Sequence, residues 1–286
     1  MIIMNNTIYS ANAPIGIFDS GIGGLTVARA LADALPNEHF IYIGDTAHLP
    51  YGLKSTEAIL EYCMGISQYL YESGCKMIII ACNTASAAAY EKLKAYWQGR
   101  MFVVDVITPL VEFITSQSYA KIGVIATKST IRSDIYAQKI TSLNPKMEVV
   151  SLATSLLAQI IEEGFYCNQI SKAVINQYLS YPDFEEIEAL LLACTHYPLI
   201  KPEIEAYFGE RVAIYDSIQP VINIVHQILQ THQLFRTALM PNKRAQYQFL
   251  VSDYTQSFQH VTRIFYQQDI PLQKVTWEGK RLVLEQ

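Results

Sequence analysis

The stretch Ile79-Ile80-Ala81-Cys82-Asn83-Thr84 is an apolar run that ends abruptly in a cysteine followed by two polar residues. A second stretch, Leu191-Leu192-Ala193-Cys194-Thr195-His196, has the same plan. Ile15–Ser20 resembles Ile122–Thr127 in a similar way, and the two pairs are separated by nearly the same number of residues. These matches predict that the chain repeats one structural unit. If so, equivalent strand ends face each other across a cleft, with Cys82 opposite Cys194.

Apolar runs of strand length alternate along the chain with longer segments of helical periodicity. This alternation is typical of βα units and a mostly parallel sheet, so we expect an α/β fold. The segment 55–70 is predicted to be a helix with Ser55 as its N-cap. A long helix is expected over Ile218–Leu229, and the tail predicts one more strand and one more helix, Gln246–Val251 and Phe258–Tyr266. The strands expected before the tail are Ile15–Asp19, Phe40–Asp45, Met77–Cys82, Met101–Asp105, Lys121–Ala126, Glu148–Leu152, Ile187–Cys194 and Val212–Tyr215.

Composition narrows the class of protein. A chain of 286 residues suits one large or two medium domains. Hydrophobic residues make up 51% of it and charged residues 16%, so the chain can form a core and is not expected to be disordered. No apolar run reaches the length of a membrane-spanning helix. The net charge of −5, without a Lys/Arg cluster, gives no support for nucleic-acid binding. Residues 1–13 lack the features of a targeting segment, so we expect a cytoplasmic protein.

The chain has five cysteines, and none forms a Cys-x-x-Cys pair. Cys82 and Cys194 stand at the predicted carboxyl ends of strands, where open α/β sheets bind ligands. A helix N-terminus there would favour a thiolate and bind carboxylates. A single cysteine is more often a small buried hydrophobe, but two in matched contexts favour chemistry. Cys63, Cys75 and Cys167 lack this context and are assigned to packing or to the surface.

Two further side chains are candidates for the same cleft. Asp19 ends the first predicted strand, where it could cap the following helix or form a hydrogen bond with a thiol or a substrate amine. The glycines after it allow a tight turn but lack the spacing of a dinucleotide-binding fingerprint. His196 could be structural or could act as a general acid or base. Cys82, Cys194, His196 and Asp19 would also suit zinc, although no compact zinc spacing is present.

Several motifs together resemble those of glutamate racemases, within the cofactor-independent aspartate/glutamate racemase superfamily. They are Ile17–Val27, Tyr42–Ala47, Pro50–Gly52, Ala81–Ser86 and Leu192–Leu199. The resemblance implies two similar α/β domains, each with a mostly parallel sheet flanked by helices, and an active site at the inter-domain cleft. It implies residues 1–105 plus 219–286 for the first domain and 106–218 for the second.

The activity implied by the resemblance is interconversion of L- and D-glutamate by proton transfer at Cα, which supplies D-glutamate for peptidoglycan. One cysteine removes the α-proton and the other delivers a proton from the opposite face, without a cofactor or metal. The expected partner is therefore a small-molecule substrate, and we also expect a homodimer. An aspartate or hydantoin racemase, a related cysteine-dependent decarboxylase and a non-catalytic amino-acid binding module are the alternatives.

By the same resemblance, Cys82 and Cys194 are the catalytic pair, Asp19 assists Cys82, and His196 with Glu162 assists Cys194. Glu162 and Glu163 are not separated, because their alignment depends on a Glu-x-Gly match alone, and both also suit a solvated helix end. The substrate contacts implied are Asp19, Ser20, Tyr51, Gly52, Asn83, Thr84, Thr130, Thr195 and His196.

Overall fold

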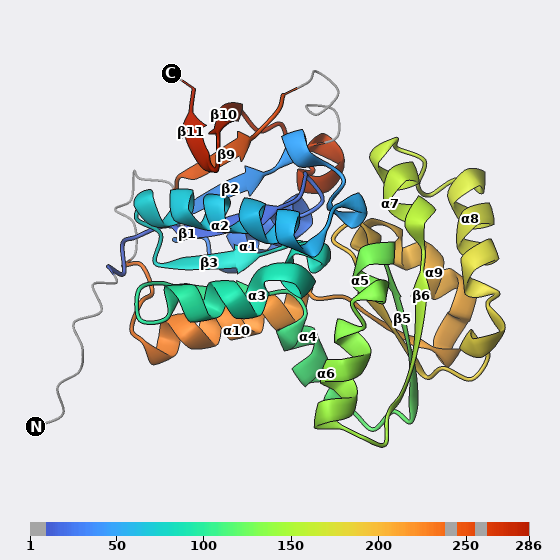
Figure 1. Cartoon of the computed structure of the whole chain (residues 1–286). Coiled ribbons are helices and arrows are strands. Elements are labelled where there is room, and N and C mark those ends of the chain that lie inside the picture. Colours follow the sequence, from blue (N-terminus) through green and yellow to red (C-terminus); the bar gives the residue numbers. More distant parts are fainter. Residues whose placement is uncertain (1–9, 238–244, 255–261, 286) are drawn as a thin grey trace, which may run out of the picture.

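The computed structural model describes residues 10–237, 245–254 and 262–285. Its helices flank two separate sheets, one built mainly from the first part of the chain and the other from the middle (Figure 1). This arrangement confirms the predicted α/β fold with parallel sheets.

The larger sheet has the strand order β11-β10-β9-β2-β1-β3-β4. All neighbours in it are parallel except β10 and β11. Helices α2 and α3 pack on one face, and α1 and α10 lie on the other. The strands are β1 (Ile15–Asp19), β2 (Phe40–Gly44), β3 (Met77–Ile80), β4 (Phe102–Asp105), β9 (Tyr247–Val251), β10 (Leu272–Glu278) and β11 (Arg281–Leu284). The helices are α1 (Leu25–Ala34), α2 (Thr56–Glu72), α3 (Asn83–Trp97) and α10 (Ile218–Thr231).

The smaller sheet has the order β6-β5-β7-β8, and all its strands are parallel. Its central strands β5 and β7 are almost fully buried, as expected for a parallel sheet covered on both faces. The strands are β5 (Lys121–Ala126), β6 (Glu148–Ala153), β7 (Ala189–Ala193) and β8 (Ala213–Tyr215). The helices of this part are α4 (Thr108–Thr115), α5 (Lys128–Arg132), α6 (Ile135–Leu143), α7 (Ser155–Glu162), α8 (Gln169–Leu179) and α9 (Lys201–Phe208).

The two sheets repeat one topology. Strands β2-β1-β3-β4 follow the same order as β6-β5-β7-β8, so β3 in one sheet is equivalent to β7 in the other. Cys82 follows β3 and Cys194 follows β7. The sequence echo therefore reflects a structural repeat, and the two thiols occupy equivalent positions.

Side-chain contacts near these strand ends join the two halves of the molecule, one with the larger sheet and the other with the smaller sheet. Thr26 Oγ1 at the start of α1 donates to the carbonyl of Thr195 at 3.0 Å. The hydroxyls of Thr84 and Thr127 lie 3.0 Å apart. Helix α10 packs against α1 and α4. The exact domain boundaries given above, 1–105 plus 219–286 and 106–218, stay a prediction.

The predicted strands before the tail all form, with ends that shift by one or two residues, and Ser55 caps α2 by accepting from Ala58 N. The hairpin of β10 and β11 was not predicted. Only Val275 and Leu282 are buried in it, so the hairpin lacks a continuous run of buried apolar residues. The predicted helix Phe258–Tyr266 begins outside the described residues, and residues 262–266 are helical. In the part of the chain that is described, no helix has the length and apolar character needed to cross a bilayer.

Candidate active site

A cavity of about 620 Å³ lies at the carboxyl ends of the two sheets, and both cysteines line it. The half of the molecule with the larger sheet contributes the turns after β1 and β3 and the Leu49–Leu53 segment. The half with the smaller sheet contributes the turns after β5 and β7 and one side of α7. The lining residues are Ser20, Leu49, Pro50, Tyr51, Gly52, Leu53, Cys82, Asn83, Thr84, Thr127, Lys128, Ser155, Leu156, Ala158, Gln159, Glu162, Tyr178, Cys194, Thr195 and His196.

Cys82 is itself the N-cap of α3. Its Sγ accepts from Ala85 N at 3.4 Å and lies 3.4 Å from Ser20 Oγ. The sequence suggested that a helix N-terminus would favour the thiolate here. Burial has the larger effect, and together with the Asp19 carboxylate it raises the pKa of Cys82 from 9.0 to about 12, despite the Ser20 and Ala85 contacts that oppose it. Cys82 is therefore a thiol at neutral pH.

Asp19 stands behind Cys82 and is only 1% exposed. Its Oδ2 accepts from Gly24 N at 2.8 Å, so the carboxylate closes the turn that leads into α1. Its Oδ1 is buried without a hydrogen-bond partner among the described residues. Asp19 is not among the residues that line the cavity, but its charge acts on the Cys82 thiol.

Cys194 has a different set of neighbours. Its Sγ lies 3.6 Å from His196 Nδ1, and the other ring nitrogen of His196 lies 2.7 Å from Glu162 Oε1. Burial alone would lower the pKa of His196, but Cys194 and Glu162 outweigh it and raise that pKa well above its usual value. The imidazole therefore lies between a sulfur and a carboxylate, where it can carry a proton to or from the cavity.

The structure distinguishes between the two adjacent glutamates. Glu162 reaches His196 from the last turn of α7 and lines the cavity, whereas Glu163 is the C-cap of that helix and lies outside the lining. Thr130 is buried behind the cavity wall, where its hydroxyl lies 3.2 Å from Thr84 Oγ1 and 3.1 Å from Thr127 Oγ1. The remaining predicted contacts line the cavity, namely Ser20, Tyr51, Gly52, Asn83, Thr84, Thr195 and His196.

Gly23 allows the two halves to meet at this site. A Cβ at this position would lie 2.5 Å from His196 Nδ1 and 2.7 Å from Thr195 Oγ1. The turn after β1 therefore approaches the Cys194 turn more closely than any side chain would permit. The group that approaches the Gly23 backbone is the His196 imidazole.

Comparison with known proteins decides the family. The family model for Asp/Glu/Hydantoin racemase matches residues 23–225. The chain is 39% identical over 252 residues to glutamate racemase from Geobacter metallireducens, covering 88% of this chain and 92% of that protein. The chain belongs to the Asp/Glu/Hydantoin racemase family.

Solved structures support this assignment. Glutamate racemase from Francisella tularensis, in complex with D-glutamate, superimposes with a TM-score of 0.86 at 38% identity, covering 93% of this chain and 98% of that chain. An isoform from Bacillus anthracis, RacE1, gives a TM-score of 0.83 at 30% identity, covering 95% and 99%. The protein is therefore a racemase-family enzyme with the fold of solved glutamate racemases.

Five polar residues that line the cavity were not predicted from the sequence, namely Thr127, Lys128, Ser155, Gln159 and Tyr178. A signal existed for Thr127, because the internal repeat aligns it with Ser20. Lys128 is the only Lys or Arg among the described residues that line the cavity. It provides a cation for a carboxylate beside the hydroxyl and amide donors of the wall.

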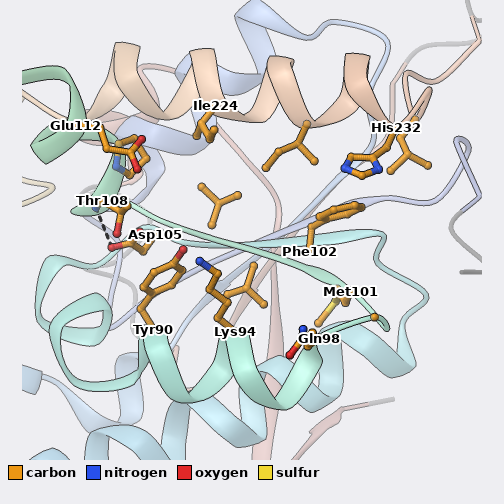
Figure 2. Close-up of a pocket in the computed structure, with 16 residues that line it drawn as sticks. Tyr90, Lys94, Gln98, Met101, Phe102, Asp105, Thr108, Glu112, Ile224 and His232 are labelled. Carbon is orange, nitrogen blue, oxygen red and sulfur yellow. Dashed lines mark hydrogen bonds between the residues drawn. The ribbon is translucent and has the colours of Figure 1, made fainter. Parts of the chain in front are cut away.

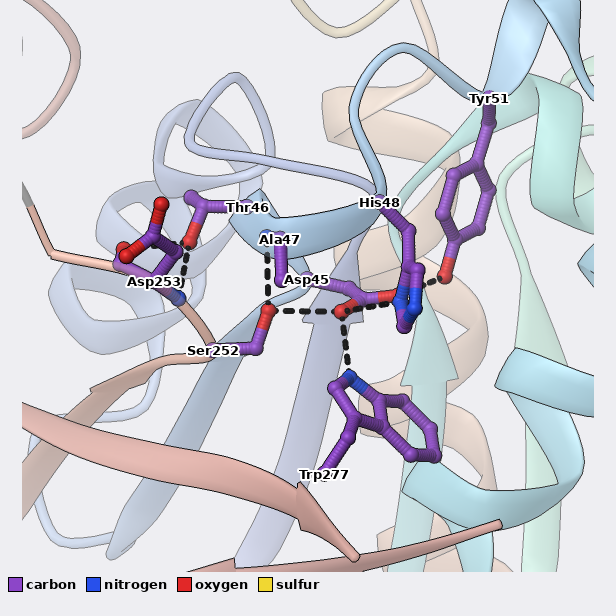
Figure 3. A network of polar contacts seen from close by, with 8 residues as sticks. All are labelled: Asp45, Thr46, Ala47, His48, Tyr51, Ser252, Asp253 and Trp277. Carbon is purple, nitrogen blue, oxygen red and sulfur yellow. Dashed lines mark hydrogen bonds and ion pairs between the residues drawn. The ribbon is translucent and has the colours of Figure 1, made fainter. Parts of the chain in front are cut away.

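A buried polar network supports one wall of the cavity (Figure 3). Asp45, at the end of β2, accepts from the Tyr51 hydroxyl at 2.7 Å, from Ser252 Oγ at 2.6 Å and from Trp277 Nε1 at 2.8 Å, and His48 Nδ1 lies 2.8 Å away. Burial would raise the pKa of Asp45, but these hydrogen bonds outweigh it and lower the pKa. The Asp45 carboxylate thus links Tyr51, which lines the cavity, to Ser252 after β9 and to Trp277 in β10.

A second cavity, of about 630 Å³, follows the edge strand β4 between α3 and α10 (Figure 2). Its walls include Phe102, Ile224 and His232, with Asp105 at one end, and neither Cys82 nor Cys194 lines it. Among the described residues, no group of three or more His, Cys, Asp or Glu side chains is arranged to hold a metal ion.

Proposed function

We propose that this chain is a glutamate racemase that interconverts L- and D-glutamate through Cys82 and Cys194. The observation that carries the proposal is that both thiols line one cavity from equivalent strand ends of two sheets. Inversion at one carbon needs an acid and a base on opposite faces, and two facing halves can supply them. The names of the relatives, including a structure with D-glutamate bound, support glutamate as the substrate.

In each direction one cysteine starts as a thiolate and the other as a thiol. The thiolate removes the α-proton, the thiol gives its proton to the opposite face of the same carbon, and the protonation states of the two sulfurs are exchanged. Burial beside Asp19 favours the thiol form of Cys82, whereas Cys194 lies beside the His196 imidazole, which can accept or return a proton.

Stabilisation of the carbanion-like transition state is the larger task, because an α-proton is far less acidic than a thiol. Donors fixed around the substrate carboxylate reduce this barrier in the way an oxyanion hole does. The wall offers the Thr84 and Thr195 hydroxyls and the Lys128 ammonium for this purpose. Asp19 and Thr130, which stand behind the wall, act on the substrate through Cys82 and Thr84.

Racemisation of L- and D-glutamate by purified protein tests the proposal. Cys82→Ala and Cys194→Ala should each lose at least about a thousandfold in kcat, because each removes one partner of the proton transfer. Cys167→Ala, at an exposed cysteine, is the matched control and should retain full activity. Full racemisation by either of the first two variants would reject the assignment.

The alternatives predict different products. An aspartate or hydantoin racemase would turn over its own substrate faster than glutamate, and a decarboxylase would release carbon dioxide. A binding module would bind an amino acid without turnover.

A supply of D-glutamate to peptidoglycan, a cytoplasmic location and a homodimer also stay predictions. Sedimentation analysis of the purified chain tests the last.

A further inference from the structure

Asn83 occupies the first turn of α3, directly after Cys82, and lines the cavity although its side chain is buried. The two ends of its amide have different environments. Oδ1 accepts a hydrogen bond from the hydroxyl of Tyr136 at 2.7 Å. Nδ2 is buried and has no hydrogen-bond partner among the described residues. A buried donor without a partner is costly, so a group that binds in the cavity is its natural partner.

Tyr136 fixes which end of the amide faces the cavity. It comes from α6, in the half of the molecule opposite to α3, and is only 3% exposed. Burial, with smaller contributions from the Asp105 and Cys194 charges, raises the pKa of this tyrosine well above 10.0, so its hydroxyl keeps its proton. Asn83 Oδ1 is the acceptor that this proton has in the described structure. Rotation of the amide by half a turn would present Nδ2 instead and leave the hydroxyl proton unpaired.

We propose that Tyr136 is a positioning residue that holds the Asn83 amide with Nδ2 directed at a carboxylate of the substrate. The inference rests on the proposed function, since it assumes that glutamate occupies this cavity. An amide nitrogen donates and never accepts, so a carboxylate oxygen is the matching group on the substrate. The contact crosses between the two halves, and therefore the donor is oriented only when α6 and α3 are docked together.

A donor that binds the carboxylate equally in the ground state and in the transition state affects KM and leaves kcat nearly unchanged. Tyr136→Phe keeps the ring and removes only the hydroxyl. We expect it to raise KM for both enantiomers of glutamate about fivefold, with kcat within about twofold of the wild type, because the amide is then free to rotate. A role confined to packing would lower the melting temperature without this split between KM and kcat.

The test measures racemisation by Tyr136→Phe, Asn83→Ala and the double variant. If Tyr136 acts through Asn83, the double variant has the same KM as Asn83→Ala. Asn83→Asp keeps an acceptor for Tyr136 but replaces Nδ2 by an oxygen, so its KM should rise at least as much as that of Asn83→Ala. Tyr119→Phe is the matched control, because it also removes a hydrogen-bonded hydroxyl, one that pairs with Tyr215 away from the cavity.

The outcomes distinguish the positioning role of Tyr136 from the proposed racemase activity. An unchanged KM in Tyr136→Phe would overturn the positioning role. So would a KM in the double variant that rises above that of Asn83→Ala by the same factor as in Tyr136→Phe alone. In both cases the racemase assignment stands. Failure of the wild type to racemise glutamate would overturn the proposed function and the inference with it.

Discussion

Glu162 Oε1 lies 2.7 Å from His196 Nε2, and this contact joins the end of α7 to the turn that follows β7. The opposite nitrogen of the same ring lies 3.6 Å from Cys194 Sγ. A carboxylate, an imidazole and a thiol are therefore aligned on one side of the cavity. On the other side Cys82 has Ser20 and Asp19 for neighbours, so the two equivalent cysteines lie in chemically different surroundings.

Glu162→Gln keeps the size of the side chain but removes its charge. Because Glu162 is one of the groups that raise the pKa of His196, the variant should lose the imidazolium at a lower pH than the wild type. We expect kcat/KM to fall about tenfold near pH 8 and the alkaline limb of its pH profile to move to lower pH. The measurement is a pH profile of racemisation, with Glu163→Gln as the control. An unshifted profile in Glu162→Gln would contradict the role.

Cys82 should make stability depend on pH. Its pKa is raised from 9.0 to about 12, so the folded protein keeps a proton that the unfolded chain releases. The contribution of this thiol is fully present below pH 9.0 and is lost as the pH rises toward about 12, at about 1.4 kcal/mol per pH unit.

Urea unfolding of the wild type and of Cys82→Ser between about pH 9 and pH 10.5 measures this effect. The other buried thiols and tyrosines titrate in both proteins and cancel in the difference. The free energy of unfolding should fall less steeply in the variant. A difference that stays constant over this range would show that Cys82 is not held as a thiol.

Asp45→Asn tests whether the buried network around Asp45 holds Tyr51 in the cavity wall. The amide cannot accept from all the donors that now converge on the carboxylate, so buried donors are left unpaired. We expect the free energy of unfolding to fall by about 3 kcal/mol and KM for glutamate to rise. Asp253→Asn is the control, because only backbone atoms of Asp253 bond to Thr46. Equal stability of the two variants would argue against the network.

Gly23→Ala tests the close approach of the two halves. The added methyl would lie 2.5 Å from His196 Nδ1, so the imidazole or the whole turn must move. We expect kcat to fall at least about tenfold, because a small displacement of a catalytic group is costly. Circular dichroism should show an intact fold, and wild-type kcat in the variant would mean that the His196 position is not needed.

The strands were predictable because buried parallel strands require continuous apolar runs, as in Met77–Ile80 and Ala189–Ala193. The β10–β11 hairpin carries only two buried apolar residues, and its clearest signal is Gly279, which has a φ of 62° at the turn. A glycine at this position favours a tight turn between two strands.

The two thiols were predictable as candidates because each follows an apolar run at a strand end. Their neighbours depend on contacts between distant parts of the chain. Glu162 meets His196 only when α7 packs beside the turn after β7, and Tyr136 meets Asn83 only across the two halves. Asp45 likewise meets Trp277 from the far end of the sequence. Local patterns contain no information about such pairs.

In the proposed mechanism two sulfurs act on opposite faces of one carbon. Racemisation of each enantiomer in heavy water, stopped at low conversion, tests it most directly. With two separate acids and bases, the product should carry deuterium at Cα while the remaining substrate keeps its protium, in both directions. Deuterium that appears in the unreacted substrate as fast as in the product would mean that one group both removes and returns the proton, and would contradict the account.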